Sequence, residues 1–130
     1  NGDFSATATL MNLTDGGIDL YSGNDDQVLP ILSLGGLGVI SVLSNVAPKE
    51  THDMVMKFFE GDTKGAAKIQ IDVIPLINAL FCEVNPIPVK TALNLMGMNV
   101  GPLRMPLCEM EEASKETLIK AMKNFGIKLA

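Results

Sequence analysis

The run from Tyr21 to Pro48 is the feature that most constrains the fold of this chain. It reads as the end of a strand, a polar loop, an apolar helix, a Gly-Gly break, an apolar strand and a second polar loop. Two parallel strands joined by a helix bring both loops to the same edge of a sheet. Proteins of the α/β class place binding and catalytic groups at that edge, the carboxyl end of the strands. The run therefore predicts an α/β fold with a functional edge.

Strands are expected at 18–21 and 38–42, and Gly35 with Gly36 should end the helix between them. The second strand is a continuous apolar run rich in β-branched residues, which is typical of a strand buried on both faces. A stable sheet needs at least three strands, and only these two are visible in the sequence. We therefore expect a fragment of a larger α/β domain, or a domain that another chain completes.

Helices are expected on both sides of this unit. A short one at 3–14 should be capped by Asp3 or Ser5, and the helix between the strands by Asn24 or Asp25. The apolar spacing after the second strand predicts four helices. The first, at 48–60, has Met54, Val55, Phe58 and Phe59 on its apolar face, and the second is longer, capped by Asp62 or Thr63 and kinked at Pro75. The third is introduced by Pro86 and Pro88 and ends at Gly97, and the last is capped by Ser114 and ends at Gly126.

Composition excludes several classes of function. The net charge is −5 and the ten basic residues are scattered, which argues against binding to a nucleic-acid backbone. The apolar stretches are shorter than the roughly 18–20 residues of a membrane span. The first ten residues form neither a signal peptide nor a basic arm and lack an initiator Met, so we expect the chain to begin inside a longer polypeptide. Cys82 and Cys108 have no partner motif, which is typical of free thiols in a reducing compartment.

The segment Ser22-Gly23-Asn24-Asp25 leaves the carboxyl end of the first expected strand. Two interpretations are open: Gly23 allows close backbone approach to a ligand beside a polar pocket, or the segment is a plain turn with a helix cap. Ile40 and Ser41 likewise either offer main-chain groups to a small ligand or belong to a core strand. The glycines at 35, 36 and 38 precede a strand, whereas a dinucleotide-binding loop follows one, so a nucleotide site is rejected.

Other chemically capable side chains favour structural roles. Lys90 should have its amine solvated near a helix start, whereas a Schiff-base lysine needs a dry pocket that lowers its pKa. His52 is expected to be exposed, and Glu109, Glu111 and Glu112 form a solvated charge cluster. No nucleophile–base pair and no metal-ligand spacing is visible, so neither a catalytic residue nor a metal site is assigned within these 130 residues.

Three blocks of this sequence resemble the C-terminal part of the dihydrodipicolinate synthase family, in the N-acetylneuraminate lyase group of class I aldolases. They are Ser22-Gly23-Asn24-Asp25 with Leu29-Pro30, the stretch from Gly35-Gly36 through Gly38-Val39-Ile40-Ser41-Val42 to Asn45-Val46-Ala47, and Asn85-Pro86-Ile87-Pro88-Val89-Lys90. Leu103-Arg104-Met105-Pro106-Leu107 also fits, so the blocks keep the family's order over nearly the whole chain. The family usually has Asp at the position of Asn24, a departure that leaves the turn intact.

The resemblance implies an α/β fold class: the C-terminal portion of a TIM (β/α)8 barrel, strands seven and eight with their helices, plus a three-helix C-terminal extension. Strand seven would be 18–21 and strand eight 38–42. Residues 1–60 would form the C-terminal part of the barrel, and residues 61–130 the helical extension.

The resemblance also implies part of a lyase that condenses pyruvate with L-aspartate 4-semialdehyde through a lysine Schiff base, the first committed step of diaminopimelate and lysine biosynthesis. Ile40 would line the pyruvate site with its backbone near the carboxylate, and Gly23 would lie beside the bound imine through its main-chain carbonyl. No cofactor is implied besides the covalent imine with the substrate. The implied partners are small-molecule substrates, the missing N-terminal part of the same barrel and further copies in a tetramer or dimer, with no nucleic acid and no membrane, in the cytoplasm.

The family's strand-six motif, Lys-Glu-Ala-Ser/Thr-Gly-Asp, reaches this chain only with its last three positions, Asn1-Gly2-Asp3. The imine-forming lysine would fall three residues before Asn1 and the proton-relay tyrosine also upstream, so the isolated chain is expected to be inactive. Two alternatives remain open: a fragment of a related Schiff-base aldolase, either N-acetylneuraminate lyase or a 2-keto-3-deoxy sugar-acid aldolase, and a non-catalytic oligomerisation module. The segment 85–90 resembles the synthases more closely, and the two strands argue against an independent module.

Overall fold

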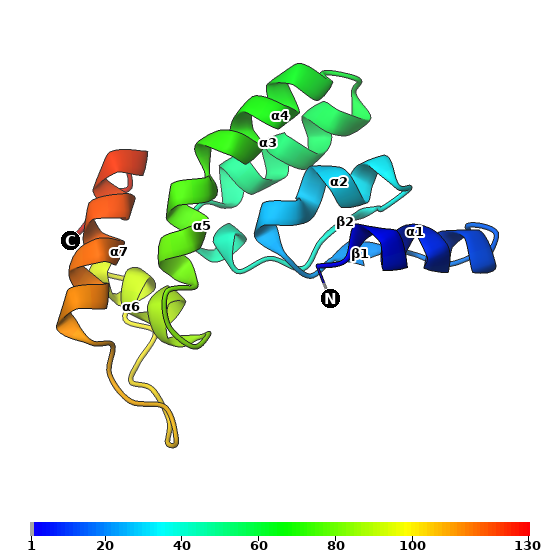
Figure 1. The fold of residues 1–130 in the computed structure, drawn as a ribbon. Coiled ribbons are helices and arrows are strands. Elements are labelled where there is room, and N and C mark those ends of the chain that lie inside the picture. The colour runs from blue at the N-terminus through cyan, green and yellow to red at the C-terminus, as the bar shows by residue number, and fades with distance from the viewer. Residues whose placement is uncertain (1) are drawn as a thin grey trace. The chain divides into compact units, whose positions relative to one another are not determined.

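The structure, a computed structural model, describes residues 2–130. Its elements are α1 (Phe4–Leu13), β1 (Tyr21–Ser22), the 3₁₀ turn η1 (Asp25–Gln27), α2 (Val28–Ser33), β2 (Gly38–Val39), the 3₁₀ turn η2 (Leu43–Asn45), α3 (Pro48–Phe59), α4 (Thr63–Asp72), α5 (Ile74–Leu80), α6 (Ile87–Leu95) and α7 (Glu112–Phe125), as Figure 1 shows. The chain divides into two compact units, each made of two segments. The first unit consists of the residues up to Ser41 together with Lys49–Asp72, and the second consists of Val42–Pro48 together with Val73–Ala130. The division between barrel and extension after residue 60, which concerns the complete protein, stays a prediction.

The sheet of the first unit is a parallel pair. Tyr21 of β1 lies opposite Gly38 of β2, and Ser22 lies opposite Val39. The predicted parallel strands are therefore confirmed, but both are shorter than expected. β2 ends at Val39 instead of residue 42 because the backbone has already turned to helical angles at Val42 (φ −82°, ψ −43°).

The two helices around β1 begin differently from each other. α1 has the predicted cap, since the Asp3 carboxylate accepts a hydrogen bond from the Ala6 N–H at 3.0 Å. α2 has no such cap: η1 precedes it, and neither Asn24 before η1 nor Gln27 before α2 makes a capping side-chain hydrogen bond. Asn24 is therefore not the cap of this helix, and the carboxylate of Asp25, the other predicted cap, accepts a hydrogen bond from the Ser41 hydroxyl.

The predicted stop at Gly35-Gly36 is confirmed. α2 ends at Ser33, and Gly35 adopts a φ of +91°, which favours glycine. The Gly36 N–H donates to the Ile31 carbonyl at 2.9 Å. A Cβ on Gly36 would lie 2.7 Å from that same carbonyl oxygen, so the close return of the chain after α2 requires glycine here.

The core of the first unit joins α2 to α3. Val28, Leu32 and Met54 are buried, and five partly buried side chains pack against them: Leu29, Val39, Val55, Phe58 and Ile69. α2 also packs on both strands (Figure 1). The prediction that Phe59 belongs to the inward face of α3 is wrong. Its side chain is 51 % exposed, because successive helix residues point about 100° apart and the neighbouring Phe58 takes the inward position.

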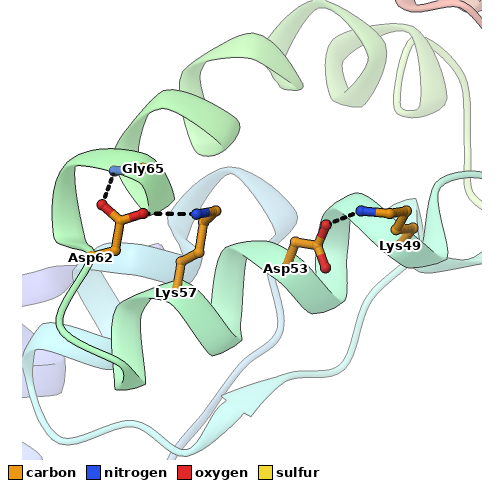
Figure 2. Close-up of polar contacts among 5 residues, drawn as sticks. All are labelled: Lys49, Asp53, Lys57, Asp62 and Gly65. Atoms are coloured by element: carbon orange, nitrogen blue, oxygen red, sulfur yellow. Dashed lines mark hydrogen bonds and ion pairs between the residues drawn. The ribbon is translucent and has the colours of Figure 1, made fainter.

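Ion pairs occupy the outer face of α3 and the turn that follows it (Figure 2). Lys49 is paired with Asp53 one turn later, and Lys57 Nζ lies 2.7 Å from an Asp62 carboxylate oxygen. Asp62 also accepts the Gly65 N–H at 2.9 Å, which confirms it as a predicted cap for α4. The Lys57 hydrogen bond, with that of Gly65, holds the pKa of Asp62 below its ordinary value.

The predicted long helix kinked at Pro75 is two helices, α4 and α5, separated at Val73. Proline lacks an N–H and its ring clashes with the carbonyl four residues earlier, so Pro75 fits only the first turn of a new helix. Residues 61–130 consequently contain four helices instead of the three expected.

The second unit packs α5, α6 and α7 together around side chains with almost no exposed surface: Leu76, Leu80, Ala92, Leu118 and Met122. α6 starts after Pro86 as predicted. α7 begins at Glu112, so Ser114 is not its cap. The start is set earlier because the Glu83 carboxylate accepts the Glu111 N–H at 3.1 Å. Gly126, with φ +92°, ends α7 as predicted.

Candidate functional site

The two candidate residues lie at the same edge of the parallel pair. The Ile40 N–H donates to the Ser22 carbonyl at 2.8 Å, so the backbone ladder ends with Ser22 on one strand and Ile40 on the other. Gly23 follows Ser22 directly. The expectation that both loops leave one sheet edge is confirmed, and it brings Gly23 and Ile40 together although 17 positions separate them in the sequence.

Gly23 lies beside open space. A Cβ built on it would have no atom within 4 Å. It forms part of the wall of a cavity of about 270 Å³ in the first unit, which is lined further by Ala6, Thr7, Leu10, Leu20, Tyr21, Ser22, Asn24, Gln27 and Ile31. A cavity of this size is large enough for a keto acid of a few heavy atoms.

Ile40 directly follows β2, which ends at Val39, and its side chain is 76 % exposed within residues 2–130. The expected burial of this strand on both faces requires elements on both sides, and no described element covers the Ile40 side chain. Its N–H is already bound to Ser22 in the ladder. A ligand at this edge would therefore meet the Ile40 side chain before this N–H.

The loop after β1 is fixed by its own hydroxyl group. Ser22 is 3 % exposed, and its Oγ donates to the Asn24 carbonyl at 2.7 Å and accepts the Asn24 N–H at 3.2 Å. These two bonds close a tight turn around Gly23. The conformation of this turn is thus fixed by hydrogen bonds within the turn itself and does not depend on a ligand in the cavity.

Asp25 is buried, with 2 % exposure, and its carboxylate accepts a hydrogen bond from the Ser41 hydroxyl. The Asp25 carbonyl accepts the Gln70 side-chain N–H at 2.9 Å, and the Gln70 amide oxygen accepts the Leu29 N–H at 3.3 Å. Gln70 comes from α4 and is only 8 % exposed. A carboxylate and an amide thus tie the loop after β1 to the end of β2 and to α4.

Sequence reasoning missed this network. Asp25 was expected as a helix cap, and Gln70 was not considered. The only signal for Gln70 is its position one helical turn after Ala66, which places a polar residue next to the apolar face of α4. Buried polar side chains of this kind usually have hydrogen-bond partners in the fold, which the sequence does not name.

The other candidates have the structural roles predicted for them. His52 is exposed on α3, and Glu109, Glu111 and Glu112 are exposed. Cys82 and Cys108 are free and exposed. Within residues 2–130, no group of three or more His, Cys, Asp or Glu side chains is placed to hold a metal ion. Over the same residues, no helix combines the length and the apolar character that crossing a membrane requires.

Lys90 supports a loop of the second unit. Its Nζ donates to the Pro102 carbonyl at 2.6 Å, and Asn94, one turn later on α6, accepts the Val100 N–H at 2.9 Å. Both side chains border a second cavity, of about 530 Å³, between α6, the loop and the start of α7. Lys90 therefore holds a carbonyl of the loop and does not stand in a dry pocket as a Schiff-base lysine would.

Comparison with known proteins supports a single family. The profile of the dihydrodipicolinate synthetase family matches residues 1–125. A 4-hydroxy-tetrahydrodipicolinate synthase of Lachnoclostridium phytofermentans is 57% identical over 127 residues, which are 98% of this chain and 43% of that protein.

Solved structures give the same result. A dihydrodipicolinate synthase from Thermotoga maritima matches with a TM-score of 0.92 and 40% identity, covering 97% of this chain and 44% of that one. A chloride-inhibited dihydrodipicolinate synthase from Acinetobacter baumannii, in complex with pyruvate, matches with a TM-score of 0.91 and 36% identity, covering 98% of this chain and 44% of that one. The chain thus spans less than half the length of these relatives. The predicted fold class, the C-terminal portion of a TIM (β/α)8 barrel with a helical extension, is confirmed.

Proposed function

The chain belongs to the dihydrodipicolinate synthetase family, and on this premise we propose that it is the C-terminal part of a 4-hydroxy-tetrahydrodipicolinate synthase. The complete enzyme would condense pyruvate with L-aspartate 4-semialdehyde, the first committed step of diaminopimelate and lysine biosynthesis. The observation that carries the proposal is the 57% identity, over 98% of this chain, to a relative of that name.

In the proposed reaction, the amine of a lysine outside this chain attacks the ketone carbon of pyruvate and water leaves, which gives an imine. Loss of a proton from the methyl carbon gives an enamine. That carbon then bonds to the aldehyde carbon of the second substrate. The amino group of the second substrate attacks the imine carbon, closes the ring and releases the lysine amine. The imine is a covalent bond to the substrate itself, so the reaction needs no separate cofactor.

This chain would supply part of the pyruvate pocket. Gly23 borders the cavity, and its lack of a side chain leaves room for the imine. Ile40 does not line that cavity, but its exposed side chain lies at the same sheet edge and would offer an apolar wall to the methyl carbon of pyruvate, which helps to exclude water from the enamine. Support for a pyruvate site also comes from the Acinetobacter baumannii relative, whose structure is a pyruvate complex.

The proposal extends to the assembly. The complete protein would act in the cytoplasm as a homo-oligomer, either a dimer or a tetramer, and the 130-residue chain alone would be inactive because the imine-forming lysine belongs to the missing part. Sedimentation of the complete protein tests the oligomeric state, and a monomer at assay concentration would contradict this part of the proposal.

Reductive trapping tests the proposed chemistry. The complete protein, incubated with pyruvate and borohydride and examined by mass spectrometry, is expected to gain one reduced pyruvate adduct, whereas the 130-residue chain should gain none. An adduct on the isolated chain would show that the nucleophile lies within it. A complete protein that traps pyruvate but turns over a keto-deoxy sugar acid, and not L-aspartate 4-semialdehyde, would assign it to the related aldolases.

A further inference from the structure

We propose that Asp25 is a positioning residue for this reaction: through the Ser41 hydroxyl it holds the loop after β1 against the end of β2 and so keeps Gly23 and Ile40 at the spacing that bound pyruvate needs. The inference rests on the proposed function. It assigns a role to a carboxylate that is buried and accepts a hydrogen bond from the Ser41 hydroxyl.

The position of this hydrogen bond supports the proposal. Asp25 stands two residues after Gly23, and Ser41 directly follows Ile40. The backbone ladder between the strands ends with the bond from Ile40 to Ser22. The Asp25–Ser41 hydrogen bond continues the connection between the two loops beyond that end. It therefore acts at once on Gly23, which lines the cavity, and on Ile40, which lies at the same sheet edge outside the lining of that cavity.

The chemistry of the pair suits a fixed geometry. A carboxylate that is 2 % exposed is costly to bury unless its oxygens accept hydrogen bonds, so Asp25 favours loop positions that keep its hydrogen-bond donors, the Ser41 hydroxyl among them, within reach. A solvated turn residue would exert no comparable hold on β2.

Gln70 gives a second, independent hold on the same residue. Its side-chain N–H binds the Asp25 carbonyl at 2.9 Å while its amide oxygen takes the Leu29 N–H at 3.3 Å. The amide therefore bridges η1 to α2 and keeps the backbone of Asp25 in place. In this way α4, which follows the last predicted barrel helix, supports the edge where the chemistry is proposed to occur.

The test uses the complete protein with Asp25→Ala, Ser41→Ala, the double variant and Asp25→Asn. Each alanine variant should raise the KM for pyruvate about tenfold, as expected for loss of one hydrogen bond to a charged group, with a smaller change in the KM for L-aspartate 4-semialdehyde. The double variant should cost less than the product of the two single effects, because each alanine change removes the Asp25–Ser41 hydrogen bond. Asp25→Asn keeps an oxygen acceptor and should restore most of the loss.

Met54→Ala is the matched control, because it destabilises the core of the first unit without touching this hydrogen bond. If Asp25→Ala and Ser41→Ala raise the pyruvate KM no more than Met54→Ala does, or if their effects multiply in the double variant, the positioning role is wrong. Should Asp25→Ala fail to fold, Ser41→Ala decides alone, since it removes the same bond and keeps the carboxylate. A wild-type complete protein that traps no pyruvate would instead overturn the proposed function, and this inference with it.

Discussion

Gly36 and Gly23 are expected to respond in opposite ways to the same change, a substitution by alanine. At Gly36 the new methyl group would lie 2.7 Å from the Ile31 carbonyl oxygen and 2.9 Å from its carbonyl carbon. Both are backbone atoms in α2, so no side chain can turn away to make room. At Gly23 no atom lies within 4 Å, and its φ is outside the range that favours glycine.

The magnitudes follow from these distances. Forcing a methyl group into a packed site costs about 1–3 kcal/mol, and here the end of α2 has to move. Gly23→Ala creates no such contact, and the smaller conformational freedom of the unfolded chain should change stability by at most about 1 kcal/mol in the favourable direction. Taking roughly 2–4 °C per kcal/mol, Gly36→Ala should lower the Tm by at least about 2 °C and Gly23→Ala should not lower it.

The assay is thermal unfolding of the complete protein by circular dichroism, with the KM for pyruvate measured on the same samples. Gly23→Ala is expected to raise that KM, because its methyl group enters the proposed pocket, while the Tm stays at or above the wild-type value. Equal losses of Tm in the two variants would refute the steric argument. An unchanged KM for Gly23→Ala would show that Gly23 does not border the pyruvate site.

Three further predictions concern stability. Leu118→Ala in α7 removes a side chain with no exposed surface and should lower the free energy of unfolding by about 2–5 kcal/mol, measurable by urea titration; a loss well under 1 kcal/mol would contradict the packing described for the second unit. Gly126→Ala should lower the Tm more than Gly126→Asn, since a φ of +92° is tolerated better by asparagine than by alanine; the reverse order would argue against this helix end. Hydrogen bonds from Lys57 and Gly65 hold the pKa of Asp62 below its ordinary 3.8. Ionised Asp62 therefore stabilises the fold above that pH, and this contribution is lost as the pH falls through the lower folded-state pKa. In thermal melts at a series of pH values, Asp62→Asn should show a smaller acid-induced loss of Tm than the wild type.

Local signals in the sequence predicted most of the elements. The Asp3 cap, the stops at Gly35-Gly36 and Gly126, and the parallel order of the two strands depend on residues close to each other in the chain. The predictions that were wrong depend instead on contacts between residues far apart in the chain. The start of α7 is decided by a hydrogen bond from Glu111 to Glu83, 28 positions earlier, and no periodicity around Ser114 reports that contact.

What the sequence determined by itself was the order of strands and helices, the family, and the shared sheet edge of Gly23 and Ile40, because backbone propensity, glycine positions and motif spacing are all written along the chain. Only the tertiary structure decided the use of Asp25. Its carboxylate binds Ser41, 16 positions away, and its carbonyl binds Gln70, 45 positions away. A buried polar group needs a partner, but which one it receives depends on how distant segments pack.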